Sequence, residues 1–97
     1  MDKKDRRLLY KTAVKCYGEE DQIAKAVEEI GELLNALAKH HFQRATIDEV
    51  IDELADVSII IECVADMINW KDFETRKEYK LNRLRKRLDD IINNSNK

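Results

Sequence analysis

Residues 46–69 read TIDEVIDELADVSIIIECVADMIN and carry the strongest structural signal in the chain. They begin with a capping box, in which the Thr46 hydroxyl and the Glu49 carboxylate can each accept a hydrogen bond from a backbone amide that lacks a helical partner. In the first half, the apolar residues recur on one face of the predicted helix. From Val57 onward, at about 100° per residue, they surround the helix axis. We therefore predict a helix over residues 47–69 whose second half is buried on every side.

Two further helices are expected before this stretch. The first spans about residues 3–17 and ends at Gly18, because glycine readily adopts the backbone conformations that end helices. The second spans about residues 20–41 and has apolar residues at steps of three and four. This pattern predicts a core stripe made of Ile23, Val27, Ile30, Leu34 and Leu37.

A fourth helix is expected after the quoted stretch. Asp72 follows a predicted turn at Trp70 and Lys71 and is the expected cap of this helix. Residues 93–97 are expected to fray. The apolar line of this helix would consist of Leu81, Leu84, Leu88 and Ile91.

The composition also indicates an all-α fold. Charged residues make up 39% of the 97 residues, and there are no prolines and only two glycines, so strong helix breakers are nearly missing. A chain of this length has room for one domain. We therefore predict a single all-α domain over residues 1–97, forming a four-helix bundle-like chain.

The sequence also indicates a soluble, cytoplasmic protein. Its N-terminus lacks the apolar core of a secretory signal, and its longest apolar stretch is too short to span a bilayer, so no membrane partner is expected. Cys16 and Cys63 show no metal-ligand spacing, and we expect both to be reduced and to serve as small apolar fillers. The net charge of −2 argues against a nucleic acid polymer as partner.

The all-round apolar segment after Val57 predicts self-association. A four-helix chain of this size has too little surface to cover such a segment, so the cover is expected from a second copy, in a homodimer or homotetramer. A different interpretation of the same feature is a non-catalytic helical oligomer that binds a protein partner through its amphipathic faces.

The near-neutral total conceals a segregation of charge along the chain. Residues 19–56 carry a net charge of −8, whereas residues 1–18 and 71–97 each carry +4. An acidic middle is therefore flanked by basic ends.

Within the acidic middle, carboxylates recur at helical spacing. Glu29 is followed by Glu32, and Glu53 by Asp56, so each pair lies on one face of its helix. Antiparallel helices with a short connection would bring the two pairs together, and four facing carboxylates repel one another unless a cation neutralises them. Oxygen ligands without histidine or cysteine select Mg²⁺, Mn²⁺ or Ca²⁺ over zinc, so Mg²⁺ is the expected cofactor and Mn²⁺ a substitute. The alternative is a solvated acidic face.

The predicted fourth helix offers the complementary charge. Arg76, Lys80, Arg83 and Arg87 follow steps of four, three and four beside the apolar line. These cations could hold phosphates at the rim of the acidic site, or they could form a solvated basic face.

A longer pattern resembles the MazG-like all-α nucleoside triphosphate pyrophosphohydrolases, whose signature is an EExxE block followed by ExxD on the next helix. The resemblance covers about residues 17–88. The matching positions are Tyr17-Gly18, Gln22, Glu28-Glu29-Ile30-Gly31-Glu32-Leu33 and Glu53-Leu54-Ala55-Asp56-Val57.

The resemblance implies hydrolysis between the α and β phosphates of a nucleotide, giving a nucleoside monophosphate and pyrophosphate. It implies that Glu29, Glu32, Glu53 and Asp56 are Mg²⁺ ligands and that Glu28 either supports these ligands from behind or positions water beside them. Phosphoribosyl-ATP pyrophosphohydrolase activity is the related alternative.

The resemblance also implies a set of substrate-binding residues. Gln22 and Tyr17 would lie near the nucleoside, and Lys77, Lys80 and Arg83 would contact the phosphates. Relatives commonly have lysine directly before asparagine in this helix, whereas Leu81 separates Lys80 from Asn82 here.

Overall fold

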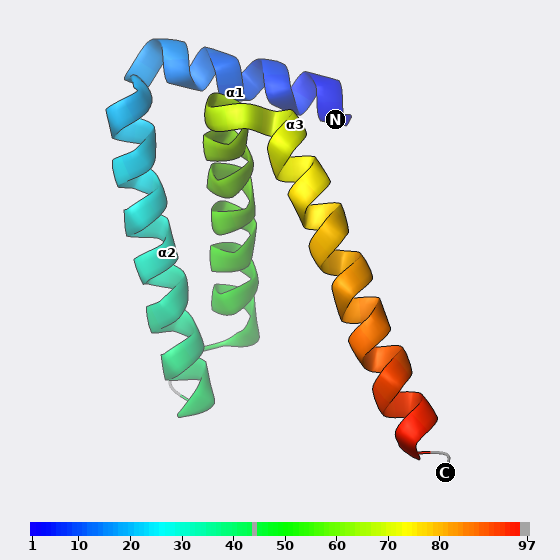
Figure 1. Ribbon diagram of the computed structural model, residues 1–97. Helices are drawn as coiled ribbons and strands as arrows, with labels where there is room; N and C mark the ends of the chain where they lie inside the picture. Colours follow the sequence, from blue (N-terminus) through cyan, green and yellow to red (C-terminus); the bar gives the residue numbers. More distant parts are fainter. Residues whose placement is uncertain (44, 96–97) are drawn as a thin grey trace.

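The computed structural model describes residues 1–43 and 45–95, which form three helices and contain no strand. These helices are α1 (Lys3–Tyr17), α2 (Glu19–His41) and α3 (Ile47–Ser95). As Figure 1 shows, α1 lies across one end of an antiparallel hairpin made by α2 and the beginning of α3. The prediction of an all-α chain is confirmed.

Local hydrogen bonds explain where α1 begins and where it ends. The Asp2 carboxylate caps the first turn by accepting a hydrogen bond from the Asp5 amide at 2.8 Å. Gly18 ends the helix with its amide 2.7 Å from the Val14 carbonyl oxygen, as expected. Its φ of +92° lies in a region that other residues rarely adopt, and this turn starts α2 one residue later.

The predicted capping box forms at the start of α3. The Thr46 amide donates to Glu49 Oε2 at 3.1 Å, and the Glu49 amide donates to Thr46 Oγ1 at 3.2 Å. Both amides lie at the start of the helix, where they have no carbonyl partner in a preceding turn. The two hydrogen bonds therefore specify where α3 begins.

A kink at Asn69 divides α3 into a first limb, residues 47–68, and a C-terminal limb, residues 70–95. Asn69 has extended backbone angles (φ −174°, ψ 98°), and its side-chain oxygen accepts a hydrogen bond from the Asp72 amide at 3.0 Å. The predicted turn at Trp70 and Lys71 with Asp72 as cap is therefore wrong by one to three residues.

Asn69 is the N-cap of the C-terminal limb, because its side-chain oxygen accepts a hydrogen bond from the amide three residues later. Trp70, Lys71 and Asp72 are consequently part of the new helix. The segment expected to fray is helical through Ser95, and residues 96–97 lie outside the described residues.

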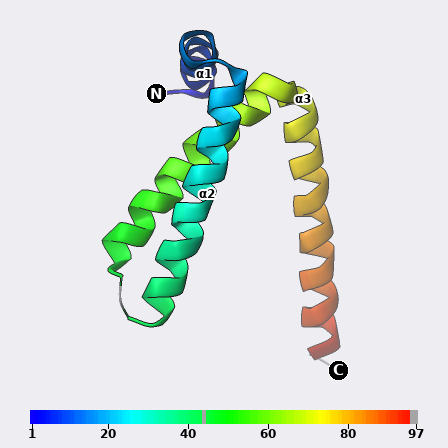
Figure 2. The same cartoon turned by 90° about the vertical axis from the view of Figure 1, so that its left-hand side faces the viewer.

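The C-terminal limb diverges from the hairpin in both views (Figures 1 and 2). The described residues therefore do not close a four-helix bundle within one chain.

The core is small and lies where α1 crosses the hairpin. Tyr10, Ile60 and Cys63 form its buried centre, with Val14 and Ala26 packed against it. Both cysteines are free, as expected, but Cys16 is exposed and fills no space in the core.

The predicted core stripe of α2 is not covered within one chain, which corrects that expectation. Its five side chains are between 41% exposed, for Ile30, and 69% exposed, for Val27. The apolar line of the C-terminal limb is likewise 48–60% exposed. The physical reason is that α2 packs against the first limb through another face, which carries Gln22, Ala26, Glu29, Leu33 and Ala36. The C-terminal limb diverges from the hairpin (Figures 1 and 2) and leaves its own apolar line exposed.

No helix within the described ranges is both long and apolar enough to cross a membrane.

Candidate metal centre

The antiparallel hairpin brings together carboxylates that are far apart in the sequence. One carboxylate oxygen each of Glu29, Glu53 and Asp56 lies within 4.8 Å of the other two. Glu29 and Glu53 are half-buried, and Asp56 is exposed. Three of the four predicted ligands thus converge, because Glu53 and Asp56 are one turn apart on the first limb and α2 presents Glu29 to them.

The other two predicted acids border this group. Glu32 is exposed and lines an adjacent pocket of about 350 Å³, which Glu53 also lines. Glu28 is exposed too, and its charge acts on Glu29. Both are therefore placed at the rim of the three converging carboxylates.

The electrostatics of the group are unfavourable as it stands. Glu29 Oε2 and Glu53 Oε2 are buried and have no hydrogen-bond partner among the described residues. Burial raises the pKa of Glu29, and the negative charges of Glu32 and Asp56 raise it further, against a smaller opposing effect of Lys25. A buried carboxylate oxygen without a partner is costly, so the site favours a positive ligand.

The donor atoms fit a hard divalent cation. All three converging groups are carboxylates, and the group includes no histidine or cysteine. Oxygen-only donor sets suit Mg²⁺, Mn²⁺ or Ca²⁺. The two unpartnered buried oxygens are the atoms that such a cation would neutralise.

The residues predicted to contact the nucleoside differ in environment. Gln22 is only 5% exposed, and its side-chain oxygen lies 3.7 Å from the Cys63 sulfur, which donates to it. It is thus a polar member of the core. Tyr17, at the end of α1, is 65% exposed.

The predicted phosphate-binding cations lie elsewhere in this chain. Lys77 and Lys80 line a groove between the two limbs of α3, and none of the carboxylates named above lines it. Arg83 is exposed on the C-terminal limb. Within one chain, the carboxylates and these lysines therefore do not share a pocket.

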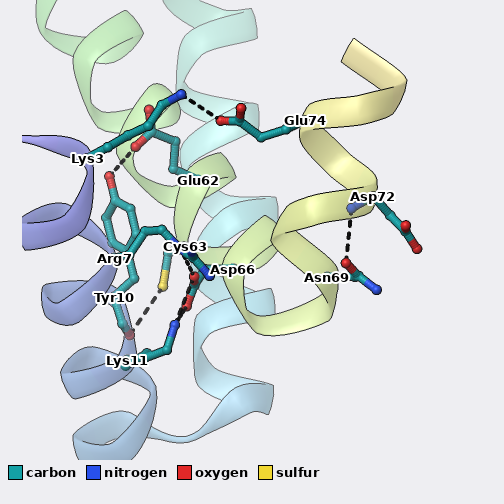
Figure 3. Close-up of polar contacts among 10 residues, drawn as sticks. All are labelled: Lys3, Arg7, Tyr10, Lys11, Glu62, Cys63, Asp66, Asn69, Asp72 and Glu74. Carbon is teal, nitrogen blue, oxygen red and sulfur yellow. Dashed lines mark hydrogen bonds and ion pairs between the residues drawn. The ribbon is translucent and has the colours of Figure 1, made fainter. Parts of the chain in front are cut away.

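A polar cluster that was not predicted joins α1 to the first limb of α3 (Figure 3). The Tyr10 hydroxyl donates to Glu62 at 2.5 Å, and Arg7 and Lys11 both bind Asp66. Burial raises the pKa of Tyr10 to about 12, with the hydrogen bond to Glu62 and its charge adding to the effect. The feature of the sequence that could have indicated this cluster is the pair of acids, Glu62 and Asp66, which lie four residues apart inside an apolar segment.

Comparison of the chain with protein-family models, with curated proteins and with solved structures finds no match in any of the three.

Proposed function

We propose that the protein is a Mg²⁺-dependent nucleotide pyrophosphohydrolase that cleaves the bond between the α and β phosphates of (deoxy)nucleoside triphosphates. The observation that carries this proposal is the convergence of Glu29, Glu53 and Asp56 with two buried, unpartnered oxygens. The acid blocks of the MazG-like pattern contain these same three residues. The proposal includes a MazG-like all-α fold and a homo-oligomeric state.

The chain's own residues have distinct roles in this proposal. Glu29, Glu53 and Asp56 would hold Mg²⁺, and Glu32 lies next to them. When bound, Mg²⁺ supplies positive charge to phosphate oxygens and lowers the pKa of a coordinated water. A rim carboxylate, Glu28 or Glu32, orients the attacking water or accepts its proton. The products are a nucleoside monophosphate and pyrophosphate.

A panel of nucleoside triphosphates with Mg²⁺, assayed for monophosphate and pyrophosphate together, tests this function. Glu29→Gln and Asp56→Asn are expected to lower kcat/KM by about 100-fold or more, because each removes charge from the site that stabilises the reacting phosphates. Asp52→Asn, an exposed acid on the same limb and outside the converging group, is the matched control and should retain activity. Equal rates for all four proteins would refute the proposal. A preference for phosphoribosyl-ATP in the panel would select that related activity.

The exposed apolar faces favour one alternative, a non-catalytic helical oligomer that binds a protein partner. Such a protein has no need of a cation. A stabilising effect of Mg²⁺ that depends on Glu53 would argue against it.

A further inference from the structure

A polar pocket extends from the three converging carboxylates toward the turn of the hairpin. Its volume is about 350 Å³, and Glu53 belongs both to its wall and to the converging group. Glu32, Asn35 and Lys39 line it from α2, where steps of three and four residues return to the same side of the helix. Lys39 lies about 10 Å further along the helix axis than Glu32, at 1.5 Å per residue. A ligand held by the carboxylates therefore has space to extend along the hairpin.

Lys39 supplies positive charge to this pocket. It is exposed, and it makes no ion pair with any residue of the ranges 1–43 and 45–95. Arg7 and Lys11, in contrast, are both bound to Asp66. The ammonium group of Lys39 is therefore available to an anion.

The acids of the pocket have other interactions. Glu49 Oε2 accepts a hydrogen bond from a backbone amide in the capping box. Glu53 has a buried oxygen that would bind Mg²⁺, and Glu32 borders the same site. Asn35 adds a side-chain amide, which can donate two hydrogen bonds. The donors that the pocket offers to a ligand are therefore the side chains of Lys39 and Asn35.

The chemistry of the walls favours phosphate over a nucleobase. No described residue that lines the pocket is aromatic, so a base would find no ring on which to stack. The β- and γ-phosphates of a triphosphate carry more negative charge than one Mg²⁺ neutralises, and lysine binds phosphate as a point charge. A lysine beside the metal-binding carboxylates suits the phosphate oxygens that the metal does not contact.

We propose that this pocket binds the β- and γ-phosphates of the substrate, with Lys39 and Asn35 donating hydrogen bonds to their oxygens. Lys39 is then the phosphate-binding cation supplied by the same chain as the carboxylates, whereas Lys77 and Lys80 line a different cavity. Because the phosphates occupy the end of the site near the turn, the nucleoside lies toward α1, at the other end of the hairpin (Figure 1). This assignment rests on the proposed function.

Binding of inorganic pyrophosphate in the presence of Mg²⁺, measured by isothermal titration calorimetry, tests the pocket without catalysis. Lys39→Met keeps an unbranched side chain but removes its charge, and it is expected to raise the Kd by about 10-fold or more through loss of a charge-assisted hydrogen bond. Asn35→Ala should raise the Kd by about 3-fold, because it removes an uncharged donor. Lys4→Met is the matched control and should leave the Kd unchanged, since Lys4 is an exposed lysine of α1 outside this pocket. Equal Kd values for the two lysine variants, or no binding by the wild type, would overturn the proposal.

Nucleotide hydrolysis by the same variants separates phosphate binding from base recognition. Lys39→Met should lower kcat/KM by about 10-fold for every nucleoside triphosphate in the panel and leave the preference among bases unchanged. A changed base preference with an unchanged Kd for pyrophosphate would place the base in the pocket and overturn the proposal. A wild-type protein that binds pyrophosphate through Lys39 but hydrolyses no nucleotide would refute the proposed function and leave the phosphate site in place.

Discussion

Lys11 donates hydrogen bonds to both carboxylate oxygens of Asp66, at 3.0 and 2.8 Å, and so joins α1 to the first limb of α3. Arg7 binds the same carboxylate at 2.7 Å, and the Asp66 side chain is only 4% exposed. Burial raises the pKa of Asp66, but the hydrogen bonds and charges of Lys11 and Arg7 outweigh it and hold the pKa below its ordinary value of 3.8. The ionised form is therefore the one that stabilises the fold.

Asp66→Asn is expected to lower the free energy of unfolding by about 2 kcal/mol at pH 7, because two charge-assisted hydrogen-bond partners lose their acceptor charge. A depressed carboxyl pKa contributes stability above the unfolded value of 3.8 and loses it as the pH falls through the folded value. The difference between wild type and variant should therefore shrink below about pH 4. Urea unfolding at pH 7 and pH 3 measures it.

The exposed Asp89→Asn is the control for this experiment and should change the stability by less than about 0.5 kcal/mol. An Asp66→Asn effect of equal size at pH 7 and pH 3 would assign the role of Asp66 to packing and not to charge.

Replacing glycine by alanine is expected to have opposite effects on stability at the two glycine positions. Gly18 has a φ of +92°, and an added Cβ meets nothing within 4 Å, so Gly18→Ala should destabilise by about 2 kcal/mol through backbone strain alone. Gly31 lies inside α2 with equally open space, and Gly31→Ala should stabilise by up to about 1 kcal/mol, because alanine loses less backbone entropy. Thermal unfolding of both variants measures the change in Tm that each substitution causes. Similar changes in Tm would contradict the strain argument.

Mg²⁺ is expected to raise the Tm of the wild type. A cation that binds only the folded state stabilises by about 2.7 kcal/mol at one hundred times its Kd. Glu53→Gln should lose this shift, because it removes one of the converging carboxylates, whereas Asp52→Asn should keep it. Sodium chloride at matched ionic strength separates binding from screening. An equal Mg²⁺ shift in both variants would place the cation elsewhere.

The proposed function includes a homo-oligomer, and mixed dimers test whether two copies share an active site. Copies with Glu53→Gln, and copies with both Lys77→Ala and Lys80→Ala, should each be nearly inactive. After joint refolding in equal amounts, half of the dimers are mixed and each holds one intact site, so about a quarter of the wild-type rate should return. The measurement is pyrophosphate release against mixing ratio. No recovery in dimers of demonstrated mixed composition would place the lysines and carboxylates of one site in the same chain.

Several features could be predicted from the sequence because they depend on near neighbours. The capping box of Thr46 and Glu49 satisfies amides within one turn, and Gly18 ends α1 through its own backbone angles. The meeting of Glu29 with Glu53 follows from helical spacing and a short connection, which forces two helices to run antiparallel.

Other features could not be predicted because they depend on distant contacts. The kink begins at Asn69 and not at Asp72. Asparagine and aspartate are both good caps, so the local sequence does not distinguish them. Contacts from α1 lie at this kink, where Arg7 lies over the Trp70 ring and Lys3 pairs with Glu74. The family resemblance placed Gln22 near the nucleoside, and in the structure its side-chain oxygen accepts a hydrogen bond from the thiol of Cys63, 41 residues away.

The end of α1, the start of α3 and the spacing of the acids could thus be predicted from residues one or two turns apart, where geometry is set by the backbone. The tertiary arrangement determined which helix faces are covered, because a helix face is buried only when another element lies against it. Asp66 is held by residues of α1 that are 55 and 59 positions away, and the stripe of α2 has no cover within one chain. Neither result follows from local spacing, since the direction of the C-terminal limb depends on the joint packing of all three helices.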